Sequence, residues 1–194
     1  MRIFICGASG AGKSTLAKRL SEELNIPFVD GSSKVLWEKY GITNHLGLIT
    51  KSTLDPIFGL EFQEELLRHR NQVTQGVTNF VTDRTPIDNW VYFLLQMLPY
   101  TTDDQVIHYK ETCKASIRPT DFYILLKRPE DTPLEDDHMR IPNRLYQSFV
   151  SELFEGIIVG NDSNFSIEIP HYRVIKSNDI QEKLNIILPW IKKH

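Results

Sequence analysis

The sequence predicts an α/β protein with a parallel sheet and helices on both faces. Three observations support this fold class. Strand-like and helix-like segments alternate along the chain, residues 122–126 are apolar throughout, and a glycine-rich turn at residues 7–14 separates the first strand from the first helix. A fully apolar strand is expected where both faces of the sheet are covered. The chain has 194 residues, which fits one domain spanning residues 1–194 with about five strands.

Each predicted element has local support in the sequence. Residues 2–6 are rich in strand formers, and residues 13–24 carry leucines at helical spacing before Pro27 ends the helix. The helix at residues 56–73 has Asp55 as its N-cap and Pro56 in its first turn. The other predicted strands are residues 28–30, 77–82, 122–126 and 172–175, and the other predicted helices are residues 86–98, 104–117, 143–158 and 179–192.

Two segments lack clear periodicity. Residues 31–54 are interpreted as a substrate loop, and residues 160–170 as an irregular connection. Together with the helix that follows it, the first segment defines an acceptor region at about residues 31–75. A lid is expected at about residues 128–146.

Composition excludes several classes of protein. The formal net charge is −3, so duplex nucleic acid is a weak expectation. No stretch approaches the roughly 18 apolar residues of a membrane span, and the N-terminus enters the glycine-rich motif too early for a signal peptide. The two cysteines are too few for a disulfide scaffold. These features predict a protein of the cytoplasm, or of the host cytoplasm if a phage encodes it, and leave the oligomeric state open.

The strongest motif is Gly7-Ala8-Ser9-Gly10-Ala11-Gly12-Lys13-Ser14, which fits G-x-x-x-x-G-K-[ST] at every specified position. Glycines let backbone N–H groups curl around phosphates, and the helix that starts near Lys13 adds its positive dipole end. We expect this loop, with Thr15, to bind ATP. Lys13 would contact the β- and γ-phosphates and Ser14 would ligate Mg²⁺.

A second group of residues follows a predicted strand. Asp83 and Arg84 stand where the carboxyl ends of parallel strands gather and ligands bind. We expect Asp83 to hold Mg²⁺ and Arg84 to grip a phosphate or carboxylate of the acceptor. A helix-terminal charge pair without substrate is the alternative.

Asp30 ends the second predicted strand and is expected at the same edge of the sheet. Its carboxylate would orient a substrate hydroxyl or accept its proton, and capping of the next turn explains it equally well. Ser32 and Trp37 follow, and Trp37 either stacks on a base or anchors the loop in the core. Asp88 would line the acceptor pocket.

The third group is acidic and then basic, with Arg140 and Arg144 after Asp136 and Asp137. A cation that arrives on closure stabilises the charge of a moving phosphoryl group, so both arginines are predicted lid residues. A solvated cluster with Arg140 paired to an aspartate is the alternative. Asn178, between the last strand and the last helix, is predicted to contact adenine, although the same segment also fits a plain N-cap.

These groups, in this order, resemble the P-loop small-molecule kinases. The resemblance covers nearly the whole chain and is strongest to the nicotinamide-riboside-kinase-like AAA group, which includes phage deoxynucleoside monophosphate kinases. It implies the P-loop NTP hydrolase fold, with a five-stranded parallel sheet of order 2-3-1-4-5 and a mobile lid that contains the arginine after the acidic stretch. It also implies that the first motif binds ATP and Mg²⁺.

The predicted function is an ATP- and Mg²⁺-dependent kinase that phosphorylates a nucleotide or nucleoside. A deoxynucleoside monophosphate is the first choice, because Arg84 suits an acceptor that already carries phosphate. Two alternatives remain. One is a kinase that phosphorylates a base within DNA through a basic stripe containing Lys110, Lys114 and Arg118. The other is an ATPase switch without a small-molecule acceptor.

Overall fold

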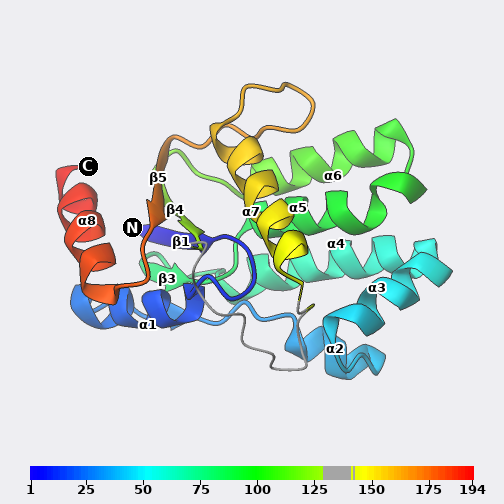
Figure 1. The fold of residues 1–194 in the computed structure, drawn as a ribbon, viewed down its shortest axis with the longest axis horizontal. Coiled ribbons are helices and arrows are strands. Elements are labelled where there is room, and N and C mark those ends of the chain that lie inside the picture. The colour runs from blue at the N-terminus through cyan, green and yellow to red at the C-terminus, as the bar shows by residue number, and fades with distance from the viewer. Residues whose placement is uncertain (129–140, 142) are drawn as a thin grey trace.

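A five-stranded parallel sheet forms the centre of the computed structural model, with strand order β2-β3-β1-β4-β5 (Figure 1). The structure describes residues 1–128, 141 and 143–194. The strands are β1 (Arg2–Cys6), β2 (Phe28–Val29), β3 (Phe80–Thr82), β4 (Asp121–Lys127) and β5 (His171–Lys176). The predicted fold class and strand order are confirmed.

Helices cover both faces of this sheet. In chain order they are α1 (Lys13–Leu24), α2 (Lys34–Tyr40), α3 (His45–Leu54), α4 (Pro56–Val73), α5 (Pro86–Met97), the 3₁₀ turn η1 (Leu98–Tyr100), α6 (Asp103–Ala115), α7 (Arg144–Val159) and α8 (Ile180–Lys193). Figure 1 shows α1 and α8 together on one side, and α4 to α7 on the other. None of the helices among the described residues is both long and apolar enough to cross a membrane.

Strand β1 is apolar on both faces because helices cover both sides of the sheet. Ile3 and Ile5 pack with α1 and α8, whereas Phe4 and Cys6 pack with α5, α6 and α7. Cys6 is fully buried in the second of these two sets. The chain thus has one core on each face of the sheet.

Residues 31–54 form helices α2 and α3 rather than the predicted loop. The two helices have seven and ten residues, so each shows too few turns for an apolar period to stand out. Leu36, Ile42 and Leu48 are buried with Phe62 and Leu66 of α4 in a third, smaller core. Packing on α4, rather than a regular pattern of their own, stabilises these helices. The segment at residues 160–170 contains no helix or strand, as predicted.

Candidate active site

The glycine-rich turn between β1 and α1 has the backbone of a phosphate-binding loop. Gly7 has φ +136°, and a Cβ there would lie 2.4 Å from the carbonyl oxygen of Leu126 in β4. Gly12 has φ +83° and precedes the first residue of α1. Both conformations favour glycine, so the residues that the motif specifies are those that the backbone requires. The loop also leads into a helix N-terminus, where unpaired N–H groups attract anions.

Lys13 folds back over this loop. Its Nζ donates hydrogen bonds to the carbonyl oxygens of Gly7, at 2.7 Å, and Ala8, at 2.9 Å. Burial, and after it the positive charge of Arg84, lowers the pKa of the Lys13 ammonium to about 8. The ammonium is thus held by neutral oxygens where an anion would bind more strongly.

Ser14 and Asp83 bring two oxygen ligands together beside the loop. The Ser14 hydroxyl donates a hydrogen bond to Asp83 Oδ2. The other carboxylate oxygen, Oδ1, is buried and accepts no hydrogen bond from any residue that the structure describes. A buried oxygen without a partner is costly, and a hard cation with its water shell would satisfy it. These two residues therefore fit a Mg²⁺ ion bound together with phosphates.

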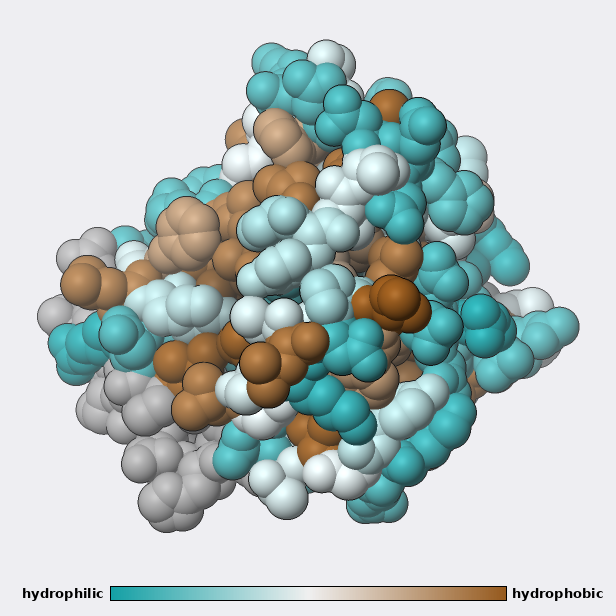
Figure 2. All heavy atoms as spheres, turned by 90° about the vertical axis from the view of Figure 1, so that its right-hand side faces the viewer, coloured by the Kyte–Doolittle hydropathy of each residue, from teal (hydrophilic) through white to brown (hydrophobic). Residues whose placement is uncertain are grey.

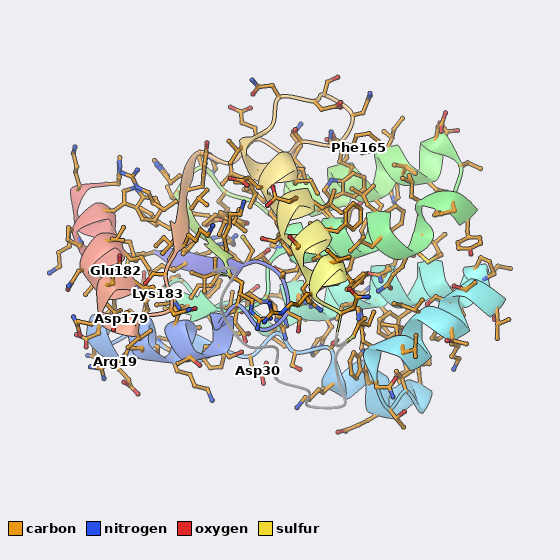
Figure 3. The ribbon with its side chains drawn as sticks, in the orientation of Figure 1. Arg19, Asp30, Phe165, Asp179, Glu182 and Lys183 are labelled. Carbon is orange, nitrogen blue, oxygen red and sulfur yellow. The ribbon has the colours of Figure 1, made fainter. Side chains whose placement is uncertain are left out.

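One cavity of about 440 Å³ joins the loop to helices α2 to α5 and α7. This volume is typical of a site for a small molecule. Figure 3 shows Asp30 after β2, near the end of α1 that follows the glycine-rich loop. Nine predicted site residues line the cavity: Ser9, Lys13, Ser14, Asp30, Ser32, Trp37, Asp83, Arg84 and Asp88.

Two arginines stand on the acceptor side of this cavity. Arg84 donates one hydrogen bond to the backbone carbonyl of Asp83, at 3.1 Å. Arg70 of α4 donates to the carbonyl of Gly31, at 3.1 Å, and to Asn89 Oδ1, at 2.5 Å. Burial lowers the pKa of Arg70 to about 10, and it remains positive at neutral pH. Neither guanidinium forms a salt bridge with a described carboxylate, although the buried Asp88 carboxylate interacts with both at longer range.

Asp30 and Ser32 form a local turn at the rim. Asp30 Oδ1 accepts a hydrogen bond from Ser32 N at 2.8 Å, and Ser32 Oγ accepts one from Lys34 N at 3.3 Å. Asp30 therefore caps the turn that follows it, which is the alternative role that the sequence suggested. The carboxylate nevertheless remains exposed and lines the cavity, so the geometry is compatible with its predicted role toward an acceptor hydroxyl.

Asp88 has a structural role at the start of α5. Its Oδ2 accepts hydrogen bonds from Thr85 N at 3.0 Å and Thr85 Oγ1 at 2.6 Å, while Thr85 Oγ1 accepts one from Asp88 N. This is a capping box. Burial raises the pKa of Asp88, and the positive charges of Lys13, Arg70 and Arg84 oppose that rise more than the bond to Thr85 does. Asp88 therefore lines the cavity, as predicted, but its main role is to fix the start of α5.

Trp37 lies between the cavity and the third core. Its ring is partly buried against the cluster that contains Leu36 and Phe62, which is the anchoring role considered from the sequence. Its indole Nε1, however, is buried and donates to no described residue. The residue therefore offers a ligand both a flat ring and an unpaired hydrogen-bond donor.

The sequence did not reveal several polar residues of the cavity. Arg70, Gln63, Gln96 and His45 lie on helices whose polar positions are ordinarily read as solvent-facing. Gln63 carried a usable signal, because it stands between Phe62 and Leu66 on the buried side of α4. A polar residue in an apolar stripe indicates an internal polar site.

Lys183 of α8 is a further cation that sequence reasoning missed. A Cβ at Gly12 would lie 3.6 Å from its Nζ, and burial lowers its pKa. Figure 3 shows Lys183 and the capping Asp179 on the first turns of α8. Asp179 accepts a hydrogen bond from Glu182 N at 2.7 Å, so the capping role considered for this segment is present. The predicted contact of Asn178 with adenine stays a prediction.

The predicted lid falls partly outside the described residues. Arg140, Asp136 and Asp137 lie among residues 129–140, which the structure does not describe. Arg144 is the first residue of α7 and is exposed, and it does not line the cavity. The roles of both arginines, and of the exposed Thr15 in α1, stay predictions.

The basic stripe considered for DNA is largely engaged within the protein. Lys110 Nζ donates to the carbonyls of Ser163, at 2.7 Å, and Asn164, at 3.0 Å. Lys114 approaches Glu111 at 3.7 Å on the same helix. These contacts reduce the positive charge available to a phosphate backbone.

The glycine-rich loop between β1 and α1, together with the parallel sheet of order 2-3-1-4-5, defines a P-loop protein. The chain belongs to the AAA domain family, whose model matches residues 2–154. No curated protein sequence matches it significantly.

Three solved structures illustrate the similarity of fold. A deoxyadenosine kinase from M. mycoides with the products dCMP and dCDP bound has TM-score 0.69 and 18% identity, with 100% of both chains covered. A thymidylate kinase from Candida albicans has TM-score 0.57 and 13% identity, over 99% of this chain and 91% of the other. The YorR protein from Bacillus subtilis, in complex with phosphorylated GDP, has TM-score 0.51 and 18% identity, over 100% and 99%. The resemblance to P-loop kinases is confirmed at the level of the fold.

Proposed function

We propose that this protein is a phosphotransferase that moves the γ-phosphoryl group of ATP, with Mg²⁺, to a nucleotide or nucleoside. One observation carries the proposal: the phosphate-binding loop shares a cavity of about 440 Å³ with an unpaired guanidinium and a pocket lined by an aromatic ring and amides. A donor phosphate and a flat, polar acceptor can therefore meet in one cavity. Phosphoryl transfer needs mainly this positioning, together with charge stabilisation.

Each residue has a defined part in this proposal. The loop backbone and Lys13 would bind the donor phosphates, while Ser14 and Asp83 would hold Mg²⁺. When bound, this ion neutralises charge on the β- and γ-phosphates. Asp30 would orient the acceptor hydroxyl or accept its proton, and Arg140, with Arg144, would close over the moving group.

A deoxynucleoside monophosphate is the proposed acceptor. Arg84 lines the cavity next to Asp83 and forms no salt bridge with a described carboxylate. A phosphate on the acceptor would therefore form an ion pair with its guanidinium. The structural relatives act on or bind deoxynucleosides, thymidylate and guanine nucleotides, which supports acceptors of this class. A nucleoside acceptor is the second choice.

The decisive experiment is a transfer assay with labelled ATP and a panel of nucleosides and monophosphates. We expect label on at least one deoxynucleoside monophosphate, and we expect Lys13→Ala to lose about 100-fold or more of that rate, as when a charge-stabilising donor is removed. Lys192→Ala, which removes an exposed lysine from the end of α8, is the matched control and should retain the parent rate.

Other outcomes would point to the alternatives. ATP hydrolysis that does not depend on any member of the panel would indicate a switch. Label transferred only to DNA, with strong salt dependence, would indicate a DNA-modifying kinase. Unimpaired transfer by Lys13→Ala would contradict the assignment of the donor site.

A further inference from the structure

Three polar side chains from three different helices form a chain along the wall of the cavity. Gln63 of α4 donates from Nε2 to Gln96 Oε1 of α5, at 2.8 Å. Gln96 Nε2 lies 3.3 Å from His45 Nε2 at the start of α3. All three residues line the cavity, and the two glutamines are almost fully buried.

The end of this chain is an unsatisfied hydrogen-bonding group. Gln63 Oε1 is buried and accepts a hydrogen bond from no described residue. Leaving a buried acceptor unpaired is expensive, and such a group in a ligand cavity indicates a donor on the ligand. Gln63 lines the cavity, so this unpaired acceptor belongs to a side chain at the wall that a ligand would meet.

The polarity of the chain depends on His45. An amide has a donor end and an acceptor end, and a neutral imidazole carries its proton on either nitrogen. Burial lowers the pKa of His45, which favours the neutral ring at pH 7. With the proton on Nδ1, His45 Nε2 accepts from Gln96 Nε2, and Gln63 is left with its oxygen free.

The opposite tautomer reverses every bond. With the proton on Nε2, His45 donates to Gln96 Oε1, the amide of Gln96 having turned over. Gln96 Nε2 then donates to Gln63 Oε1, and Gln63 presents Nε2 as a free donor. Both states contain the same atoms and the same number of hydrogen bonds, and neither requires a net change in protonation.

We propose that His45 and Gln96 are specificity-setting residues that choose which end of the Gln63 amide faces the acceptor. The cavity would then accept bases with an exocyclic amino group, which donate to Gln63 Oε1, and bases with a keto group at that place, which accept from Gln63 Nε2. Apolar walls from Leu48, Phe62 and Leu66 suit a flat ring. This inference rests on the proposed function, because it takes the acceptor to be a nucleoside or nucleotide.

The first test compares two acceptors that differ in this group and in the proton on the adjacent ring nitrogen: deoxycytidine monophosphate and deoxyuridine monophosphate, or deoxyadenosine and deoxyinosine monophosphates if the protein prefers purines. We expect the parent to use both members of the preferred pair with kcat/KM values within tenfold of each other. A larger preference would contradict the proposed dual polarity. If no nucleoside or nucleotide is phosphorylated, the proposed function itself fails.

Gln96→Glu fixes the polarity of the chain. A carboxylate accepts at both oxygens, so Gln63 must donate to it and present Oε1 to the ligand. We expect kcat/KM for the keto acceptor to fall at least tenfold relative to the amino acceptor, with the change mainly in KM. Gln75→Glu adds the same charge at an exposed turn and should leave the ratio unchanged. An equal loss for both acceptors in Gln96→Glu would overturn the relay while leaving the kinase assignment intact.

A spectroscopic measurement on the unaltered protein covers the case in which Gln96→Glu does not fold. The imidazole ¹⁵N shifts of His45 distinguish the two tautomers. Saturation with the amino acceptor should favour the Nδ1–H form, and saturation with the keto acceptor the Nε2–H form. The same tautomer with both acceptors would overturn the proposal.

Discussion

At the residue scale, the surroundings of Lys13 favour the binding of an anion at the glycine-rich loop. The ammonium is buried and its pKa is lowered to about 8, first by burial and then by Arg84. It contacts only neutral carbonyl oxygens. Phosphates at this place would stabilise the charged form and raise the pKa again. The binding of a nucleotide is therefore linked to the protonation of this lysine.

This linkage predicts a dependence of ATP affinity on pH. Below pH 7 Lys13 is already protonated, and it adds no pH dependence. Above pH 8 the free protein has lost this proton and must take it up on binding, so ATP affinity should fall as pH rises, by at most tenfold per unit. Calorimetry at pH 9 in two buffers of different ionisation enthalpy should show proton uptake on ATP binding. Lys13→Ala is the control and should show none, and equal binding enthalpies in both buffers for the parent would contradict the prediction.

The predictable residues of the site are those fixed by strand ends and by the loop motif. Lys13, Asp83 and Arg84 follow strands, and their meeting at one edge is a consequence of parallel topology. Gln63 and Gln96 lie within helices, and which side of a helix faces a cavity depends on how the helices pack. For Gln96 that information is not local to the helix, whereas Gln63 has a local sign of it in its apolar neighbours Phe62 and Leu66.

At the element scale, α5 positions Asp83 and Arg84 because it begins directly after them. Thr85 and Asp88 form the capping box that fixes this start, and both side chains are almost completely buried. Thr85 is the N-cap of α5 and Pro86 begins the helix, and both residue types are typical of these positions. Capping signals are local, which is why the start of α5 could be predicted while α2 and α3 could not.

We expect Thr85→Ala to destabilise the protein by about 1–2 kcal/mol, because it removes the cap and leaves the buried Asp88 carboxylate with fewer donors. Urea unfolding followed by circular dichroism would measure the change. Thr85→Ser keeps the hydroxyl and should retain most of the stability. If Ser and Ala destabilised the protein equally, the methyl group and not the cap would be responsible.

At the scale of the whole molecule, the sheet separates the residues that stabilise the fold from those that form the site. The cavity lies where the strands end. At the opposite ends of β1 and β4, Arg2 donates from Nε and Nη2 to the two oxygens of Asp121, at 2.7 and 2.6 Å. Asp121 is fully buried and Arg2 nearly so, and Arg2 Nη2 also donates to the carbonyl of Ser116 at 2.9 Å. Buried charges of this kind depend on each other.

Figure 2 shows apolar side chains on the face formed by the ends of the helices on the right of Figure 1. Exposed apolar residues on α3, on α4 and near η1 include Leu46, Leu54, Ile57 and Tyr100.

Arg2→Ala should lower the free energy of unfolding by about 3–5 kcal/mol, because it leaves the buried carboxylate of Asp121 without its counter-ion. Replacing both partners, as Arg2→Met with Asp121→Leu, should restore much of that loss, since no charge then remains buried. Under conditions where the single variant is folded, its KM for ATP should match that of the parent, because the pair stands a whole strand away from Lys13. Denaturant unfolding and steady-state kinetics measure the two effects separately. A double variant no more stable than Arg2→Ala would mean that geometry rather than charge makes the pair important, and a raised KM would mean that strain at this end of β1 reaches the phosphate-binding loop.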